Sequence, residues 1–249
     1  TLTLTVHDNG NTGTGGDLVS VATSTINITA VNDAPVATIT PVSYAATEQT
    51  AVTLKNTGIS ISDVDAGSSS MTVTLAVAEG TLNVTAGTSG ALVTNSGTSS
   101  VTITGTVAQI NNLLTSNATS TVSYIDNTDT PSASSTLTLT VHDNGNTGTG
   151  GDLVAVATST INITAVNDAP VATITPVSYS NTEQVALNLK NNGLSISDVD
   201  AGSGSMTVTL AVTEGTLTVA TGTSGASVSG SGTSSVTITG TVAQINNLL

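Results

Sequence analysis

The stretch "ITAVNDAPVATI" occurs twice in the chain, at residues 28–39 and 163–174. In each copy an Asn-Asp pair stands directly before Ala-Pro, between two runs of Thr, Val and Ile, which are residues that favour β-strands. The proline fixes φ, removes one N–H donor and favours an extended start to the next segment. We therefore interpret the stretch as a linker between successive β-domains. The alternative is an ordinary Asn-Asp turn between two strands.

The spacing of 135 residues between the two copies continues along the chain. Residues 1–114 and 136–249 align without a gap and differ at about 16 positions, which is the pattern of a tandem repeat. We predict that residues 34–168 form one complete repeat, residues 1–33 the C-terminal part of a repeat, and residues 169–249 the N-terminal part of the next. Two interpretations of the partial repeats stay open: a window on a longer chain, or ends that complete each other between molecules, head to tail.

The hydrophobic residues of the chain are aliphatic. They make up 37% of the sequence, with no Phe, Trp or Cys and only three Tyr, and 24 glycines interrupt the apolar runs. Short segments that alternate apolar residues with Thr or Ser predict half-buried strands. In the complete repeat they are residues 35–40, 51–56, 70–77, 80–85, 100–105, 120–125, 136–143 and 152–166. The sequence thus predicts an all-β fold of tandem antiparallel β-sandwiches.

One segment of each repeat has helical character instead. In "GTVAQINNLL", residues 105–114, Thr106 is followed three residues later by Gln109, which is the pattern of a capping box. Val107, Ile110 and Leu114 fall on one helical face. We predict one short helix per repeat, packed across one end of the sandwich.

The charge of the chain is strongly negative and excludes several classes of function. Sixteen acidic residues face only Lys55 and Lys190, for a net charge of −14, so binding to a phosphate backbone is not expected. The lack of cysteine excludes disulfides, thiol catalysis and zinc-thiolate sites. No apolar run approaches the roughly 20 residues that span a bilayer, so no membrane insertion is expected. The acidic surface predicts a divalent cation as its counter-charge, and the alternative is that acidity only keeps the chain soluble.

The sequence offers no catalytic constellation. His7 and His142 occupy the same repeat position, each next to an Asp at the end of a strand. Neighbouring residues of a strand point to opposite faces, so such a pair is a poor dyad. We expect no enzymatic activity. The glycine-rich loop that follows each His, residues 8–17 and 143–152, is either a flexible hairpin or a further calcium-binding loop.

The acidic residues are expected to gather by topology. If successive turns alternate between the two ends of the sandwich, several oxygen-bearing side chains meet at the joint between two repeats. They are Glu48, Asp126, Asp129, Asn167 and Asp168 from one repeat and Asp198 and Asp200 from the next, with Asn32, Asp33, Asp63, Asp65 and Glu183 as repeat counterparts. Ca²⁺ takes 6–8 oxygen ligands in flexible geometry, whereas zinc prefers Cys and His and Mg²⁺ keeps more water. We therefore predict calcium sites at the joints.

These motifs resemble the cadherin-like repeats of very large secreted bacterial adhesins. "AVNDAP" is similar to the linker motif of that family, "DVD" at Asp63 and Asp65 to its Asp-x-Asp motif, and "TEQ" at Glu48 to its basal glutamate. The loop "IDNTD", with Asp126 and Asp129, stands where a second basal acidic motif is expected, although its letters depart from that motif. The resemblance implies Greek-key sandwiches, calcium as a cofactor and a location outside the cell, at the bacterial surface.

The resulting functional hypothesis is structural. We expect a stalk segment of an extracellular adhesin, stiffened by calcium ions at each joint and contacted by neighbouring repeats of the same chain. One alternative is a subunit of a self-assembling filament or surface layer, in which identical chains meet head to tail. Another is a glycan-binding module, which the small number of aromatic residues makes a weaker hypothesis.

Overall fold

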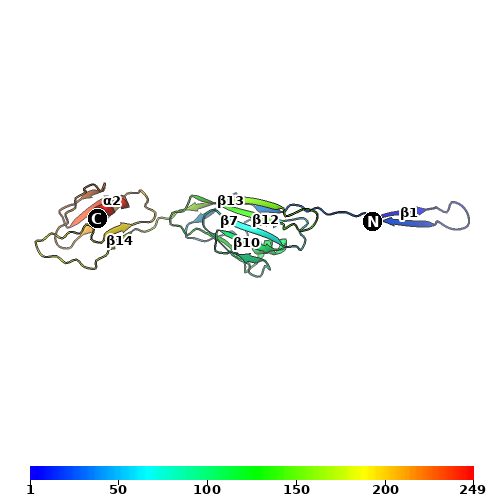
Figure 1. The fold of residues 1–249 in the computed structure, drawn as a ribbon, viewed down its shortest axis with the longest axis horizontal. Helices are drawn as coiled ribbons and strands as arrows, with labels where there is room; N and C mark the ends of the chain where they lie inside the picture. Colours follow the sequence, from blue (N-terminus) through cyan, green and yellow to red (C-terminus); the bar gives the residue numbers. More distant parts are fainter.

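The computed structural model describes all 249 residues and shows an all-β protein with a few short helical segments. Three parts follow one another along its long axis: an N-terminal hairpin, a central body built from the complete repeat, and a C-terminal part (Figure 1). A single extended segment joins each part to the next (Figure 1). No helix is long and apolar enough to cross a membrane.

The complete repeat contains the strands β3 to β13. Their bounds are β3 Val36–Ile39, β4 Ser43–Thr47, β5 Val52–Thr53, β6 Ile59–Ser62, β7 Met71–Val77, β8 Thr81–Thr85, β9 Leu92–Thr94, β10 Ser100–Gly105, β11 Thr121–Ile125, β12 Ser134–His142 and β13 Val154–Thr164. Each of the eight segments expected from the sequence contains a strand, although β5 has only two residues. The strands β4, β6 and β9 were not predicted.

These strands form one large sheet and two small ones. The order in the large sheet is β4-β13-β12-β7-β10-β9, and the small sheets are β5-β11-β8 and β3-β6. The expectation of purely antiparallel pairing is wrong at one edge, because β13 and β4 run parallel, with Thr160 beside Ser43 and Thr164 beside Thr47. The parallel direction has a consequence for the joint: both strands end on the same side of the body, so the residues that follow them meet there.

One hydrophobic core holds the complete repeat together. It contains 25 buried residues from all three sheets and from the helical segment. In β7 every second side chain, from Met71 to Val77, is buried, because side chains of a strand alternate between its two faces. The large sheet therefore turns one continuous apolar face toward the small sheets.

The predicted helix is confirmed. Helix α1, Val107–Asn111, begins at Thr106 with both hydrogen bonds of the capping box to Gln109, and it continues into the π-helical turn η1, Asn112–Ser116. Its buried residues are Ile110, Leu113 and Leu114. Helix α2, Val242–Leu248, repeats the same cap in the C-terminal part.

The partial repeats contain fewer strands than the complete one. The N-terminal hairpin consists of β1, Leu2–His7, and β2, Val19–Ser24. The C-terminal part contains β14 Val171–Ile174, β15 Leu194–Ser197, β16 Met206–Ala211, β17 Ser227–Ser229 and β18 Ser235–Gly240. Its core has 8 buried residues instead of 25.

Candidate metal sites at the two joints

The first joint connects the N-terminal hairpin with the complete repeat, and the linker is hydrogen-bonded into the body. The backbone N–H of Asp33 donates to Oδ2 of Asp65 at 3.0 Å. Asn32 is only 6% exposed, and its side-chain amide donates to Oδ2 of Asp143 at 2.6 Å and to the carbonyl of Gly151 at 3.1 Å. The Asn-Asp pair of the linker thus contacts two separate loops of the repeat that follows it.

Asp63 and Asp65 form a tight acidic turn directly after β6. Oδ1 of Asp63 accepts from the backbone N–H of Asp65 at 3.1 Å and of Ala66 at 3.0 Å. Loss of solvent raises the pKa of Asp63, and the neighbouring Asp65 carboxyl adds to this shift. Two carboxylates held side by side without a cation repel each other, so this turn would gain from a bound positive charge.

The glycine-rich loop of residues 143–152 holds the linker from the other side, and we call it the linker-binding loop. Thr149 donates its N–H to the carbonyl of Ala30 at 2.9 Å and accepts from the N–H of Asn32 at 3.3 Å. The hydroxyl of Thr147 donates to the carbonyl of Asp65. The flexible-hairpin interpretation therefore does not describe this copy of the loop, which connects the linker with the acidic turn.

Asp143 anchors the linker-binding loop from inside the protein. It is fully buried, and its Oδ1 accepts from the backbone N–H of Gly145 and of Leu153, both at 2.8 Å. Burial by itself raises the pKa of Asp143, but these two hydrogen bonds and the one from Asn32 outweigh it, so the pKa lies below its usual value. A buried carboxylate kept ionised in this way holds both the loop and the linker in place.

The second joint connects the complete repeat with the C-terminal part, and it repeats the pattern of the first. The N–H of Asp168 donates to Oδ2 of Asp200 at 3.0 Å, as Asp33 does to Asp65. Oδ1 of Asp198 accepts from the N–H of Ala201 at 3.0 Å. The Asp200 carboxyl beside it and burial raise the pKa of Asp198, whereas the contact with Asp198 and the hydrogen bond from Asp168 lower the pKa of Asp200.

Glu48 lies at the end of the complete repeat that faces the second joint. It is 1% exposed and follows the parallel strand β4, so its Oε1 accepts from the N–H of Val166 at 2.6 Å. Gln49 donates its N–H to the carbonyl of Asp126 and its side-chain amide to Oδ1 of Asp129, both at 2.5 Å. The structure thus brings Glu48, Asp126 and Asp129 to the same end of the body as the second linker.

Asp126 is occupied by structural hydrogen bonds. It is 1% exposed; its Oδ1 accepts from the N–H and the hydroxyl of Thr128 and its Oδ2 from the hydroxyl of Tyr124 at 3.2 Å. Burial and the charge of Asp126 raise the pKa of Tyr124 far above its ordinary value. These contacts favour a role for Asp126 in holding the loop after β11.

Several buried oxygen atoms at the joints have no hydrogen-bond partner. They are Oδ1 of Asn32, Oδ2 of Asp63 and Oδ1 of Asp65 at the first joint, and Oε2 of Glu48 and Oδ2 of Asp168 at the second. All five are acceptors, and buried acceptors without a donor are costly in a folded protein. An ion that is bound by oxygen ligands would satisfy them. The donor set therefore fits Ca²⁺.

The structure does not bring every expected ligand together. Glu183 lies exposed in the irregular segment between β14 and β15, and Asn167 is exposed and donates only to the carbonyl of Asp168 at 3.3 Å. No three His, Asp or Glu side chains surround one point where an ion would sit. The candidate ligands of the first joint are the carboxylates of Asp63 and Asp65 and the amide oxygen of Asn32. Those of the second joint are the carboxylates of Asp198, Asp200, Asp168 and Glu48.

The role of the linker-binding loop was missed by the sequence reasoning. The sequence marks the loop by an aspartate near each flanking strand and by four glycines between residues 145 and 151, but it does not indicate what the loop binds. His142 does not act with the adjacent Asp143; its Nδ1 lies 2.6 Å from Oδ2 of Asp152, at the other end of the loop. The partner of the loop is the linker, which lies more than a hundred residues away in the sequence.

Gly148 offers a test of the linker-binding loop. A Cβ at this position would lie 2.5 Å from the carbonyl carbon of Val31, and φ is +109°. We expect Gly148→Ala to weaken the first joint by about 2 kcal/mol or more, because the linker must move away. Limited proteolysis of the linker should become faster. Gly13→Ala is the matched control, since Gly13 has a φ of +103° but no atom within 4 Å; equal cleavage rates in the two variants would contradict the assignment.

Comparison with known proteins adds no relative: no protein-family model and no curated protein matches this chain.

Proposed function

We propose that the chain is an extender segment in the stalk of a large extracellular bacterial adhesin, built from tandem cadherin-like β-sandwich repeats with Greek-key connections. Its parts follow one another along one axis, each joined to the next by a single linker (Figure 1). The surface of the repeats is acidic, and both joints repeat the same backbone contact between linker and Asp-x-Asp turn. A spacer at the cell surface, in adhesion or in a biofilm, needs length and stiffness, and these features supply both.

The observation that carries the proposal is the set of buried oxygens without donors at the joints. At the first joint Asn32, Asp63 and Asp65 would hold Ca²⁺, with Asp33 beside them. At the second joint Asp168, Asp198 and Asp200 would do so, with Glu48 and Asn167 as further candidates, and these side chains would have to move closer together when the ion binds. Asp129 has one oxygen bonded to Gln49 and remains a candidate, whereas both oxygens of Asp126 are already used.

A joint would be stiff because its metal ligands come from both the linker and the body. A bound Ca²⁺ would supply the positive charge that the carboxylates lack, because only two lysines are present. Asp65 already accepts from the linker at Asp33 and belongs to the body, so it ties the linker to the repeat. The linker-binding loop ties the other side of the linker through Asn32. Rotation about the first joint would have to break both the contact between Asp33 and Asp65 and the contact between Asn32 and the linker-binding loop.

Small-angle X-ray scattering tests the proposal. We expect the chain in calcium to have a larger maximum dimension and a narrower distribution of shapes than the chain in chelator, because the joints bend when the acidic turns repel. The double variant Asp198→Asn with Asp200→Asn should behave in calcium as the wild type does in chelator at the second joint. Glu214→Gln, which removes one negative charge from an exposed turn away from the joint, is the control. Identical scattering in calcium and in chelator would overturn the role of calcium in the stalk.

The glycan-binding alternative is less well supported. Sugar sites commonly stack their ligands on exposed aromatic side chains, and this chain has three tyrosines. Tyr124 is fully buried and Tyr44 is 8% exposed, both in the core of the complete repeat. Only Tyr179 lies outside that core, and its hydroxyl donates to the carbonyl of Asn192. No aromatic platform is formed by these positions.

A further inference from the structure

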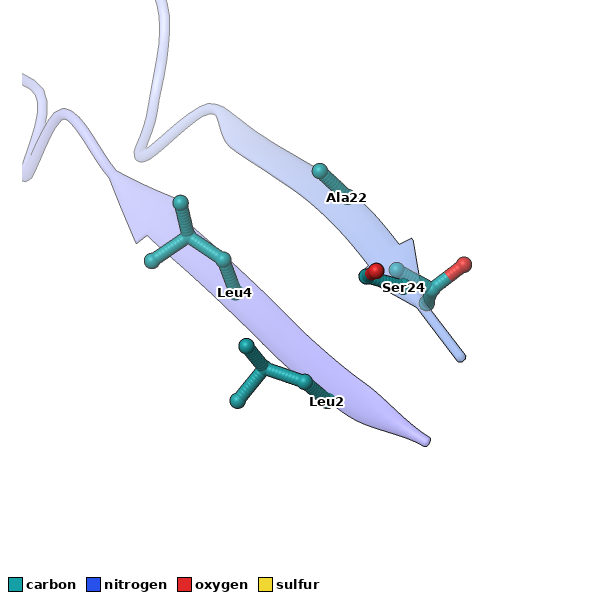
Figure 2. A pocket seen from close by; sticks show the side chains of 5 residues that line it. Leu2, Leu4, Ala22 and Ser24 are labelled. Carbon is teal, nitrogen blue, oxygen red and sulfur yellow. The ribbon is translucent and has the colours of Figure 1, made fainter. Parts of the chain in front are cut away.

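Two surface pockets are apolar and do not suit a cation. One lies on the N-terminal hairpin, where Figure 2 shows Leu2, Leu4, Ala22 and Ser24 around it. The other lies in the C-terminal part and is lined by aliphatic, Ser and Thr side chains. Neither pocket is lined by a carboxylate or an amide side chain. The buried oxygens without donors lie at the joints instead, and at the first joint the linker-binding loop is next to them.

Asn32 is the residue at which the linker and the linker-binding loop meet. Its side-chain nitrogen donates to Oδ2 of Asp143 at 2.6 Å and to the carbonyl of Gly151 at 3.1 Å. The ionised carboxylate of Asp143 and a backbone carbonyl can only accept hydrogen bonds. Turning the amide over would therefore place its oxygen against two other acceptors. The loop thus fixes the orientation of the Asn32 side chain.

This orientation leaves the side-chain oxygen of Asn32 without a donor. Oδ1 is buried and unpartnered, in a residue that is only 6% exposed. The next residue, Asp33, donates its N–H to Oδ2 of Asp65, and Oδ1 of Asp65 is a second buried acceptor without a donor. Amide and carboxylate oxygens are the ligands that Ca²⁺ takes. The contact with the loop therefore keeps one oxygen of the linker free for an ion.

The same loop also holds the segment that contains the acidic turn. The hydroxyl of Thr147 donates to the carbonyl of Asp65. The side-chain amides of Asn144 and Asn146 both donate to the carbonyl of Ser70, at 2.8 Å and 2.7 Å. Thr147 has a φ of +73°, which β-branched residues rarely adopt. The loop thus contacts the linker and the acidic turn at the same time.

We propose that the linker-binding loop positions the ligands of the calcium site at the first joint, with Asp143 acting through the amide of Asn32 and Thr147 through the backbone of Asp65. Groups that orient metal ligands commonly change metal affinity by about 10- to 100-fold. Calcium binding and docking of the linker onto the loop then strengthen each other by the same factor, because coupling between two binding events is reciprocal. The inference rests on the proposed function, since it requires calcium at this joint.

Calcium titration of four proteins tests the positioning role of Asp143. All four carry Asp198→Asn with Asp200→Asn, so that only the first joint keeps its acidic turn. In this background we expect Asp143→Asn to raise the calcium Kd about 10-fold, because an amide at residue 143 sets a donor against the donor of Asn32. Asn32→Ala should raise the Kd by a similar factor, and the combination should add nothing further. Isothermal titration calorimetry measures all four values.

The results separate this inference from the proposed function. An unchanged Kd in Asp143→Asn would overturn the positioning role alone. So would an equal increase in the presence and absence of the Asn32 side chain, since Asp143 would then act on the loop and not on the ligand. A wild-type chain that binds no calcium would overturn the proposed function together with this inference. Circular dichroism in chelator checks that each variant is folded.

Hydrogen exchange of the unsubstituted chain tests the coupling without any variant. The N–H groups of Asn32 and Thr149 donate across the contact between linker and loop, to the carbonyls of Thr149 and Ala30. We expect saturating calcium to slow their exchange about 10-fold. The N–H of Asn56, which donates to the carbonyl of Leu114 elsewhere in the repeat, is the control. Unchanged exchange at Asn32 and Thr149, or equal slowing at Asn56, would contradict a coupling through the loop.

Discussion

Replacement of Leu139 with alanine is expected to lower the free energy of unfolding of the complete repeat by about 2–5 kcal/mol. Leu139 lies in the middle of β12, is fully buried and faces Leu75 of β7. The shorter side chain loses its transfer free energy and leaves a cavity, because the surrounding sheet relaxes only in part. Urea unfolding followed by circular dichroism would measure the change.

Leu4→Ala is the matched control for this experiment. Leu4 stands in the same seven-residue sequence as Leu139, but it is 62% exposed in the free hairpin. We expect its replacement to change the free energy of unfolding by no more than about 0.5 kcal/mol, because an exposed side chain loses little packing when it is shortened. Equal losses in the two variants would show that strand propensity, and not burial, sets the stability of this segment.

Calcium is expected to raise the free energy of unfolding by about 2.7 kcal/mol for each joint at a hundred times the Kd. The gain arises because the ion binds the folded joint but not the unfolded chain. For a repeat of this size it corresponds to a shift in Tm on the order of 10 °C. Thermal unfolding in calcium and in chelator, at matched ionic strength, would measure it.

Variants of the acidic turns separate specific binding from general screening of charge. Asp63→Asn with Asp65→Asn should abolish the part of the calcium-dependent shift that the first joint contributes, because both carboxylates of its acidic turn lose their charge. Glu214→Gln removes one exposed charge from a turn and should leave the shift intact. Equal Tm values of the wild type in calcium and in chelator would contradict calcium binding at these joints.

The strands that the sequence predicted share a clear alternation of apolar and hydroxyl residues. β7, with Met, Val, Leu and Val at every second position, and β12 are the clearest cases. The missed strands have weaker patterns: β4 reads "SYAAT" and β9 has only three residues. β4 is held at the sheet edge by its parallel contact with β13, which comes from residues more than a hundred positions later. Such a contact leaves no local signal.

The placement of the candidate ligands was predictable in part. The alternation of turns between the two ends correctly grouped Asp65 with the first linker and Glu48 with the second. It did not show that Asp126 uses both oxygens within its own loop, or that Asp143 binds the linker through Asn32. Those outcomes depend on side-chain directions and on backbone donors, which sequence spacing alone does not specify.

The two copies of the glycine-rich loop show what the local sequence determines by itself. In the free hairpin the N–H of Leu18 donates to Oδ1 of Asp8 at 2.8 Å, and in the complete repeat Leu153 donates to Asp143 at the same distance. The capping boxes of α1 and α2 are likewise the same. These hydrogen bonds close within about ten residues, so they form whether or not the rest of the repeat is present.

Burial and strand pairing were decided only by the tertiary structure. Residues 178–182 and 43–47 differ at two positions, yet only the second segment forms a strand, because only it has β13 beside it. Thr147 has a φ of +73° where its loop contacts Asp65, whereas the free copy of the loop shows no positive φ at Thr12. A strand needs a partner for its backbone groups and an opposing layer for its apolar face, and both come from residues distant in the chain.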